Sequence, residues 1–214
     1  MKEMPYRISI VCFIILSVAA MVIFSSYGIN RSIWLDEAIG PLFSSGSVDF
    51  IIENLRTDNH PPLYSFLLAV WMKVFGQSEA ALRSLSGLFY FLSVFSVYFI
   101  VRELYDQKAG LICALLFLLS PLAIKHAQNV RSYTLLALFS ILSSGYFFKT
   151  FIQQKCSARN VAIYVLFNIF GTFTHYCFAF VLISHFVSFV CHYYSWKFIK
   201  TFLKATPHYL NHHS

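Results

Sequence analysis

The sequence predicts an all-α protein, a multi-pass transmembrane bundle of six or seven helices with an outer loop bearing interfacial helices. Hydrophobic residues make up 58% of the 214 residues and charged residues only 12%, and mean hydropathy is +0.65, far from the values of a soluble domain. The apolar runs are continuous rather than alternating. Because backbone polar groups cannot stay unpaired in hydrocarbon, these runs are expected to be helices rather than barrel strands.

The positive net charge of +7 does not indicate a nucleic-acid partner. Basic residues lie singly at the ends of apolar segments, where membrane topology requires them. The five cysteines include no C-x-x-C pair, and most lie inside apolar runs, so they predict neither a disulfide nor a metal site. Membrane lipid is therefore the expected surrounding of the chain.

The first span is predicted at residues 8–27, a run long enough to cross a bilayer. Lys2 and Arg7 precede it, and no small-residue cleavage site of the A-x-A type follows. The positive-inside rule then places the N-terminus in the cytoplasm and the loop at residues 30–62 outside.

The outer loop is the predicted catalytic segment because it is acidic in a chain poor in carboxylates. It holds five of the nine acidic residues, which are Asp36, Glu37, Asp49, Glu53 and Asp58. An apolar stripe around Phe50 to Leu55 lies beside some of these charges. This part is too short and too charged to cross, so we expect it to lie along the membrane surface.

The helical bundle is predicted at residues 63–195. The run at 63–75 is marginally long for a span, and longer runs follow at 80–101, 109–124, 133–151 and 161–194, the last turning near 172–176. If 63–75 does not cross, the loop 149–159 and the basic tail 196–214 are both cytoplasmic, as the positive-inside rule favours. That arrangement places residues 121–133 and the His175–Tyr176 turn on the same outer face as the acidic loop.

Asp36 and Glu37 are the candidate catalytic residues. Adjacent helical side chains point about 100° apart, so one can face a site while the other binds backbone or a cation. A partly buried carboxylate at a water–lipid boundary can act as a general base, since burial raises its pKa. The alternative is that both are solvated charges of an outer loop.

Three further groups are candidates for binding substrate. His60 precedes two prolines at a helix entrance, where it can either meet an anion or merely cap the helix. Arg131 and Tyr133, with Lys125 nearby, can bind a phosphate through the Arg fork and a Tyr hydroxyl, although a topology anchor would look the same.

The third group is His175 and Tyr176, which interrupt a 34-residue apolar stretch, where a polar pair is costly without a role. His185 and His192 share a helix face, but nothing else joins them into a metal site. A divalent cation between Glu37 or Asp58 and a phosphate is possible, yet no ligand spacing requires one.

Several motifs in order resemble a known family. They are WLDEA, NHPPLY, EAALRSLSGL, LLSP with the R-x-Y of VRSYTLL, and HYCFAF. Together they resemble the GT-C membrane glycosyltransferases, in the branch similar to dolichyl-phosphate-mannose protein mannosyltransferases and bacterial lipid A aminoarabinose transferases. The similarity covers roughly residues 8–190.

The resemblance implies a glycosyltransferase that moves a hexosyl or pentosyl group from a polyprenyl-phosphate carrier to a glycan, lipid or protein acceptor. The reaction would take place on the non-cytoplasmic face of the plasma (inner) membrane, with inversion at the sugar carbon. Asp36 would be the general base, supported by Glu37. His60, Arg131 and Tyr133 would face the carrier phosphate.

Relatives are usually much longer, so the resemblance also implies a truncated member that keeps the catalytic front half. Two alternatives to the enzyme stay open. One is a non-catalytic membrane subunit or lipid-carrier-binding protein related to such transferases. The other is a small transporter. No carboxylate lies deep in any predicted span, and this counts against ion-coupled transport.

Overall fold

The computed structural model describes residues 35–46, 48–57 and 61–205, together with four positions between residues 11 and 18. The predicted first span at 8–27 therefore falls almost wholly outside the described residues, and His60 does so entirely. Within the described part all regular elements are helical, which confirms the all-α class. They are α2 (Leu35–Ser44), α3 (Val48–Thr57), α4 (Leu63–Phe75), α5 (Glu79–Leu104), α6 (Gln107–Leu118), α7 (Pro121–Ala127), α8 (Tyr133–Phe147), the π-helix η1 (Phe148–Ile152), α9 (Ala158–Thr174) and α10 (Phe178–Ala205).

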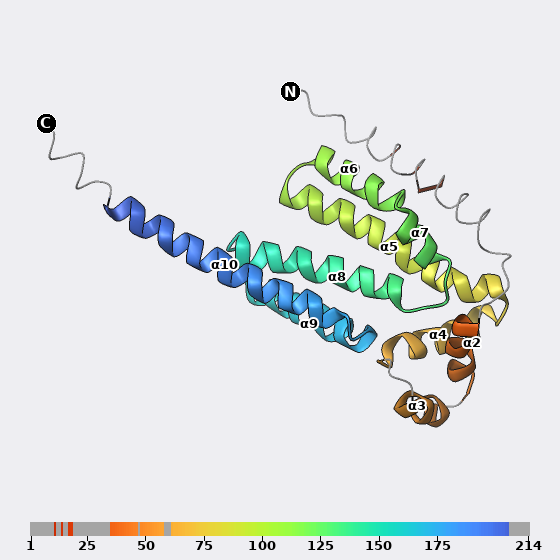
Figure 1. The fold of residues 1–214 in the computed structure, drawn as a ribbon. Coiled ribbons are helices and arrows are strands. Elements are labelled where there is room, and N and C mark those ends of the chain that lie inside the picture. The colour runs from red at the N-terminus through yellow and green to blue at the C-terminus, as the bar shows by residue number, and fades with distance from the viewer. Residues whose placement is uncertain are drawn as a thin grey trace, which may run out of the picture.

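Helix α5 is the centre of the bundle, with α4, α6, α7 and α8 packed around it (Figure 1). Its C-terminal half buries Tyr90 and Val94 against Ala114 and Leu118 of α6. Its N-terminal half packs against α4 and α8 through a second core cluster. Gly110 lets α6 approach closely, since a Cβ there would lie 2.9 Å from the Tyr98 carbonyl oxygen. Small residues at such crossings are how helices pack tightly in lipid.

The predicted span at 109–124 is broken. Helices α6 and α7 meet at an angle of 61°. Pro121 occupies the start of α7, where its missing N–H is tolerated, and the Ser120 hydroxyl caps the helix by accepting from the Ala123 N–H. The Tyr90 hydroxyl donates to the Leu118 carbonyl at the end of α6. Backbone groups on both sides of the break therefore have side-chain hydrogen-bond partners.

Helices α8, α9 and α10 form the other side of the bundle. The chain turns at residues 175–177, between α9 and α10, within the predicted turn region. Helix α10 extends through Ala205, into the segment predicted as a tail. Many of its apolar side chains are exposed, including Phe180 and Phe186, as expected for a helix facing lipid.

Six or seven spans are not confirmed. In the part of the chain that the structure describes, three helices are long and apolar enough to cross, and the bent pair α6–α7 raises the number to four. Helix α4, with 13 residues, is only about 20 Å long, short of the bilayer core. The surface position of α2 and α3 stays a prediction; in α3, Ile51 is buried while Phe50 and Ile52 are exposed.

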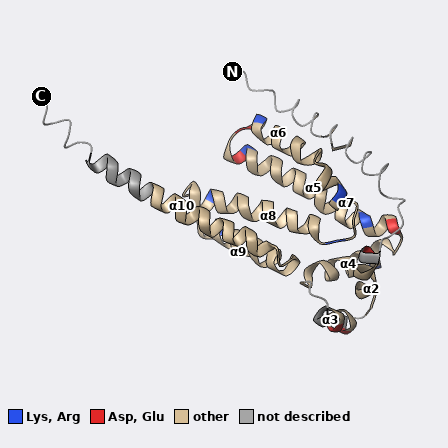
Figure 2. Cartoon of the chain, viewed as in Figure 1, with Lys and Arg blue, Asp and Glu red and all other residues tan. Residues whose placement is uncertain are grey.

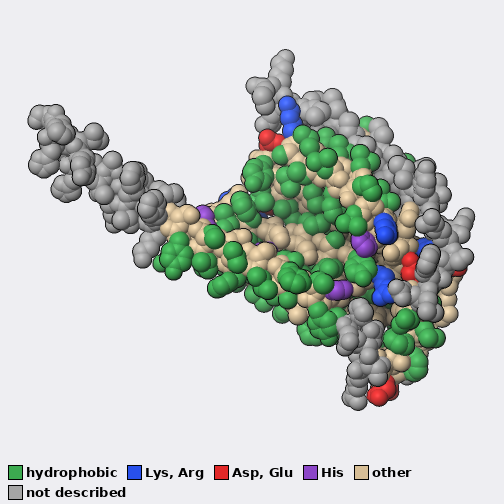
Figure 3. Space-filling model, in the orientation of Figure 1, with side chains coloured by type: hydrophobic (Ala, Val, Ile, Leu, Met, Phe, Trp, Pro, Cys, Tyr) green, Lys and Arg blue, Asp and Glu red, His purple; other side chains and the backbone are tan. Residues whose placement is uncertain are grey.

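Charged side chains gather at the two ends of the bundle, with an uncharged band between them (Figure 2). One end holds Glu103 and Lys149, whose Oε1 and Nζ atoms are 2.6 Å apart. The opposite end holds the acidic helix α2 together with Arg83 of α5, Lys125 of α7 and Arg131 of the loop before α8. Hydrophobic side chains cover most of the face between the ends (Figure 3). This distribution fits a bundle whose ends face opposite sides of a membrane.

The native cysteines test this arrangement. Cys156 and Cys177 are both exposed and lie at opposite ends of α9. In variants that keep only one of them, a membrane-impermeant maleimide applied to intact cells is expected to label Cys177 and to reach Cys156 only after permeabilisation. Labelling of both from the same side would show that α9 does not cross.

Candidate active site

A buried ion pair joins α2 to α5. The Glu37 Oε2 and Arg83 Nη2 atoms are 3.4 Å apart, and the two residues are 8% and 2% exposed. Glu79, one turn before Arg83, approaches the same guanidinium at 3.8 Å. A buried charge is stable only when it is paired, so these contacts stabilise the buried guanidinium, and the Glu37 contact fixes α2 against the bundle.

Asn129 completes the surroundings of Glu37. With its amide nitrogen turned toward the carboxylate, it donates to Glu37 Oε1 at 3.0 Å and to the Lys125 carbonyl at 3.3 Å. The loop between α7 and α8 is thereby tied to the same carboxylate as α5. Glu37 thus connects three separate segments of the chain.

Tyr64, near the start of α4, is buried within electrostatic reach of Glu37 and Arg131. Its hydroxyl is 3.3 Å from the Ser86 Oγ atom of α5, and its side chain is buried. Burial raises the pKa of the Tyr64 hydroxyl above its ordinary value; the Ser86 hydrogen bond and the Arg131 charge lower the pKa, and the Glu37 charge raises it. Arg131 and Glu37 therefore both act on this phenol, which stays protonated.

Three aromatic rings stand in a row beside these charges. The Tyr133 ring centroid is 4.8 Å from that of His126 and 5.7 Å from that of His175. The backbone N–H of Cys177 donates to the His175 Nδ1 atom at 3.0 Å. A neutral His175 therefore carries its proton on Nε2. The row connects α7, α8 and the turn before α10 at a single end of the bundle.

The structure brings most of the predicted site residues to this end. Glu37, Tyr133 and His175 lie in the contacts described above, Arg131 precedes Tyr133 by two residues, and Lys125 is exposed on α7. Tyr176 follows His175 in the turn and is 64% exposed. The backbone of Asp36 is in α2, while its side chain and all of His60 lie outside what the structure describes.

Three side chains at this end were not singled out from the sequence: Tyr64, Arg83 and Asn129. Arg83 and Tyr64 sit inside the motifs EAALRSLSGL and NHPPLY, which carried a signal. Arg83 should have attracted attention as a lone charge among apolar helical residues. Nothing local marks Asn129, since its importance depends on the fold.

No metal site is found among the described residues: no three His, Cys, Asp or Glu side chains converge there. Glu37, one of the two carboxylates considered for a cation, already faces Arg83. Asp58, the other, lies outside the described residues.

The described part of the chain is helical and includes helices long and apolar enough to cross a membrane, as in an integral-membrane protein. The family model described as dolichyl-phosphate-mannose-protein mannosyltransferase matches residues 59–210, well over half of the chain. The chain belongs to this family and is a membrane glycosyltransferase of the GT-C type. No curated protein matches the sequence, and no solved structure matches the chain. The matched residues include Arg83, Arg131 and His175, whereas Asp36 and Glu37 precede them.

The buried Glu37–Arg83 pair predicts a large coupling energy in a double-mutant cycle. Glu37→Met or Arg83→Met alone removes one partner of a buried charge and is expected to lower the free energy of unfolding by about 3–5 kcal/mol. The double variant is expected to lose less than the sum of the two. Denaturant unfolding of the purified protein in detergent measures this coupling.

The pair formed by Lys149 and Glu103 is the matched control, because its side chains are 24% and 56% exposed. The same cycle there is expected to give a coupling of about 1 kcal/mol or less. Equal coupling in the two cycles would contradict a structural role for the buried pair.

Proposed function

We propose that this protein transfers a sugar from a polyprenyl-phosphate carrier to an acceptor hydroxyl on the non-cytoplasmic face of the plasma (inner) membrane, with inversion. The observation that carries the proposal is the Glu37–Arg83 contact. It ties the acidic helix α2 to the end of the bundle where Lys125, Arg131 and Tyr133 gather. This contact supports a proposed site in which a base and a phosphate-binding group share one side of the membrane.

Arg131, Lys125 and Tyr133 form the phosphate side of the proposed site. The leaving phosphate gains negative charge as the sugar departs, and an Arg fork with nearby donors stabilises such charge in a setting with little water. Tyr64 is buried and protonated beside Arg131, so its hydroxyl adds no competing negative charge. His60 stays a proposed member of this group on sequence grounds alone.

Asp36 is the proposed general base. Glu37 contacts Arg83, and it also accepts a hydrogen bond from Asn129 when the Asn129 amide nitrogen is turned toward it. An engaged carboxylate is not free to approach an acceptor hydroxyl, because its oxygens already face other donors. We therefore divide the roles of the two neighbours: Glu37 positions α2, and Asp36 takes the proton.

The proposed step is a direct displacement at the anomeric carbon of the sugar. The Asp36 carboxylate accepts the proton of the acceptor hydroxyl, and the hydroxyl oxygen attacks the anomeric carbon. The bond from that carbon to the phosphate oxygen breaks, and its electron pair leaves on the carrier phosphate. Attack from the face opposite the leaving group gives inversion.

A carrier-binding protein without transferase activity is the second candidate. The observation in its favour is that the family match starts at residue 59 and so contains the phosphate-side residues without Asp36. The two candidates differ in turnover and share carrier binding.

Asp36→Asn separates them. If Asp36 is the base, this variant is expected to lose transfer by a factor on the order of 10²–10⁴ while still binding the carrier. The measurement is sugar transfer or release from a polyprenyl-phosphate sugar by the purified protein, with carrier binding measured in parallel.

Asp49→Asn is the control, because Asp49 is an exposed carboxylate of the neighbouring helix α3. It is expected to transfer as the wild type does. Equal rates for Asp36→Asn and wild type would remove Asp36 as the base, and carrier binding without turnover in any form would favour the second candidate.

A further inference from the structure

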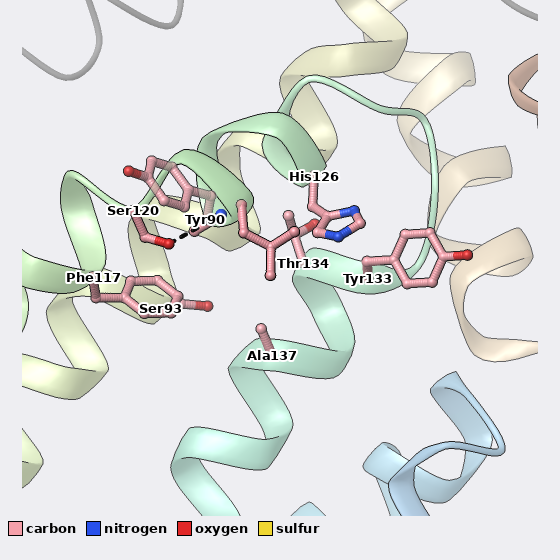
Figure 4. Close-up of a pocket in the computed structure, with 10 residues that line it drawn as sticks. Tyr90, Ser93, Phe117, Ser120, His126, Tyr133, Thr134 and Ala137 are labelled. Atoms are coloured by element: carbon pink, nitrogen blue, oxygen red, sulfur yellow. Dashed lines mark hydrogen bonds between the residues drawn. The ribbon is translucent and has the colours of Figure 1, made fainter.

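A pocket of about 190 Å³ lies at the break between α6 and α7, against α5 and α8 (Figure 4). Its walls are mainly apolar and aromatic, with Tyr90 and Phe117 on one side and Tyr133 and Ala137 on the other. Irregular backbone within a membrane protein is tolerated where it lines a cavity, and broken helices often mark ligand sites. The break between α6 and α7, together with the pocket beside it, therefore indicates a ligand site.

Two polar atoms of the pocket lining lack partners. Thr134 is only 4% exposed, and neither its Oγ1 atom nor the buried Nδ1 atom of His126 has a hydrogen-bond partner among the described residues. Leaving such a group buried and unpaired is unfavourable. Figure 4 shows the two side chains next to each other, one from α7 and one from α8. A hydroxyl and an imidazole can both donate to an oxygen placed between them.

The pocket borders both the apolar exterior and the charged end of the bundle. Leu122 at its edge is 65% exposed and Tyr133 is 37% exposed. Tyr133 also belongs to the row of rings at the proposed phosphate side, and Lys125 precedes His126 in α7. One end of a ligand in this pocket can reach the residues proposed to bind phosphate, and its other end can reach lipid.

The lining limits what the ligand can be. Apolar walls cannot satisfy the many hydroxyls of a sugar, so a sugar would be costly to bury here. The volume holds about six groups the size of a water molecule, enough for one short segment of a single hydrocarbon chain. A phospholipid with two acyl chains on one glycerol does not match a pocket of this size.

We infer that this pocket binds the first isoprene segment of a prenyl phosphate, with Thr134 and His126 donating to the oxygen that links the chain to the phosphate. The phosphate itself then lies toward Lys125 and Arg131. The inference rests on the proposed function for the identity of the carrier. It adds a subsite in which the linking oxygen, and not only the phosphate, is recognised.

Binding of farnesyl phosphate to the purified full-length chain in phosphatidylcholine nanodiscs tests the assignment. Thr134→Val removes one donor at nearly constant volume and is expected to weaken binding about five- to tenfold. Ala137→Leu fills the pocket and is expected to weaken it by on the order of tenfold or more. Thr172→Val and Ala162→Leu are the controls, because both residues lie exposed on α9, away from the pocket, and they are expected to bind as the wild type does.

Unchanged binding by Thr134→Val and Ala137→Leu, with Tm values near that of the wild type, would overturn the inference. Displacement of the probe by phosphatidylglycerol as effectively as by unlabelled farnesyl phosphate would also overturn it, because the site would then take any phosphate amphiphile. Because the assay measures binding alone, failure of Asp36→Asn to affect transfer would count against the proposed function and not against this pocket.

Discussion

The buried ion pair between Glu37 and Arg83 is the interaction on which the site depends. Arg83 is only 2% exposed. Moving α2 away from α5 would therefore take the Glu37 partner from a buried cation, which is strongly unfavourable. Asn129 extends the constraint to the loop after α7. The acidic segment, α5 and the loop before α8 are thereby held as one unit, and Asp36, Lys125 and Arg131 belong to the segments so joined.

The break between α6 and α7 is the second constraint. A straight helix through residues 107–127 would carry Lys125 and His126 further along the axis of α6, whereas the 61° bend turns them across the end of the bundle. The Tyr90 hydroxyl and the Ser120 cap satisfy the groups that the break would leave unpaired. The bend also leaves room for the pocket beneath α7. Site and pocket therefore share one structural origin.

Much of the architecture could be predicted from sequence, because it follows from hydropathy and charge. Continuous apolar runs gave the all-α class, and the basic loops at one end predicted that Lys125, Arg131 and His175 would share the other end. The number of spans could not be predicted as well. Hydropathy alone does not show that the chain bends at Pro121 of the LLSP motif.

The partner of Glu37 was also beyond the sequence. Only the fold shows that Arg83, 46 residues further on, contacts this carboxylate. Tyr64, Asn129 and His126 depend in the same way on contacts between distant segments. Local patterns fix which residue types are available, while their partners follow from the packing of α5 against its neighbours.

The transfer rate of Glu37→Gln tests most directly whether Glu37 positions α2 rather than acting as the base. Glutamine keeps an oxygen that can accept from Arg83 but cannot take the proton of an acceptor. The account predicts that this variant transfers sugar from a polyprenyl-phosphate donor at a rate well above that of Asp36→Asn. A loss as large as that of Asp36→Asn, with Glu37→Gln still folded, would contradict it.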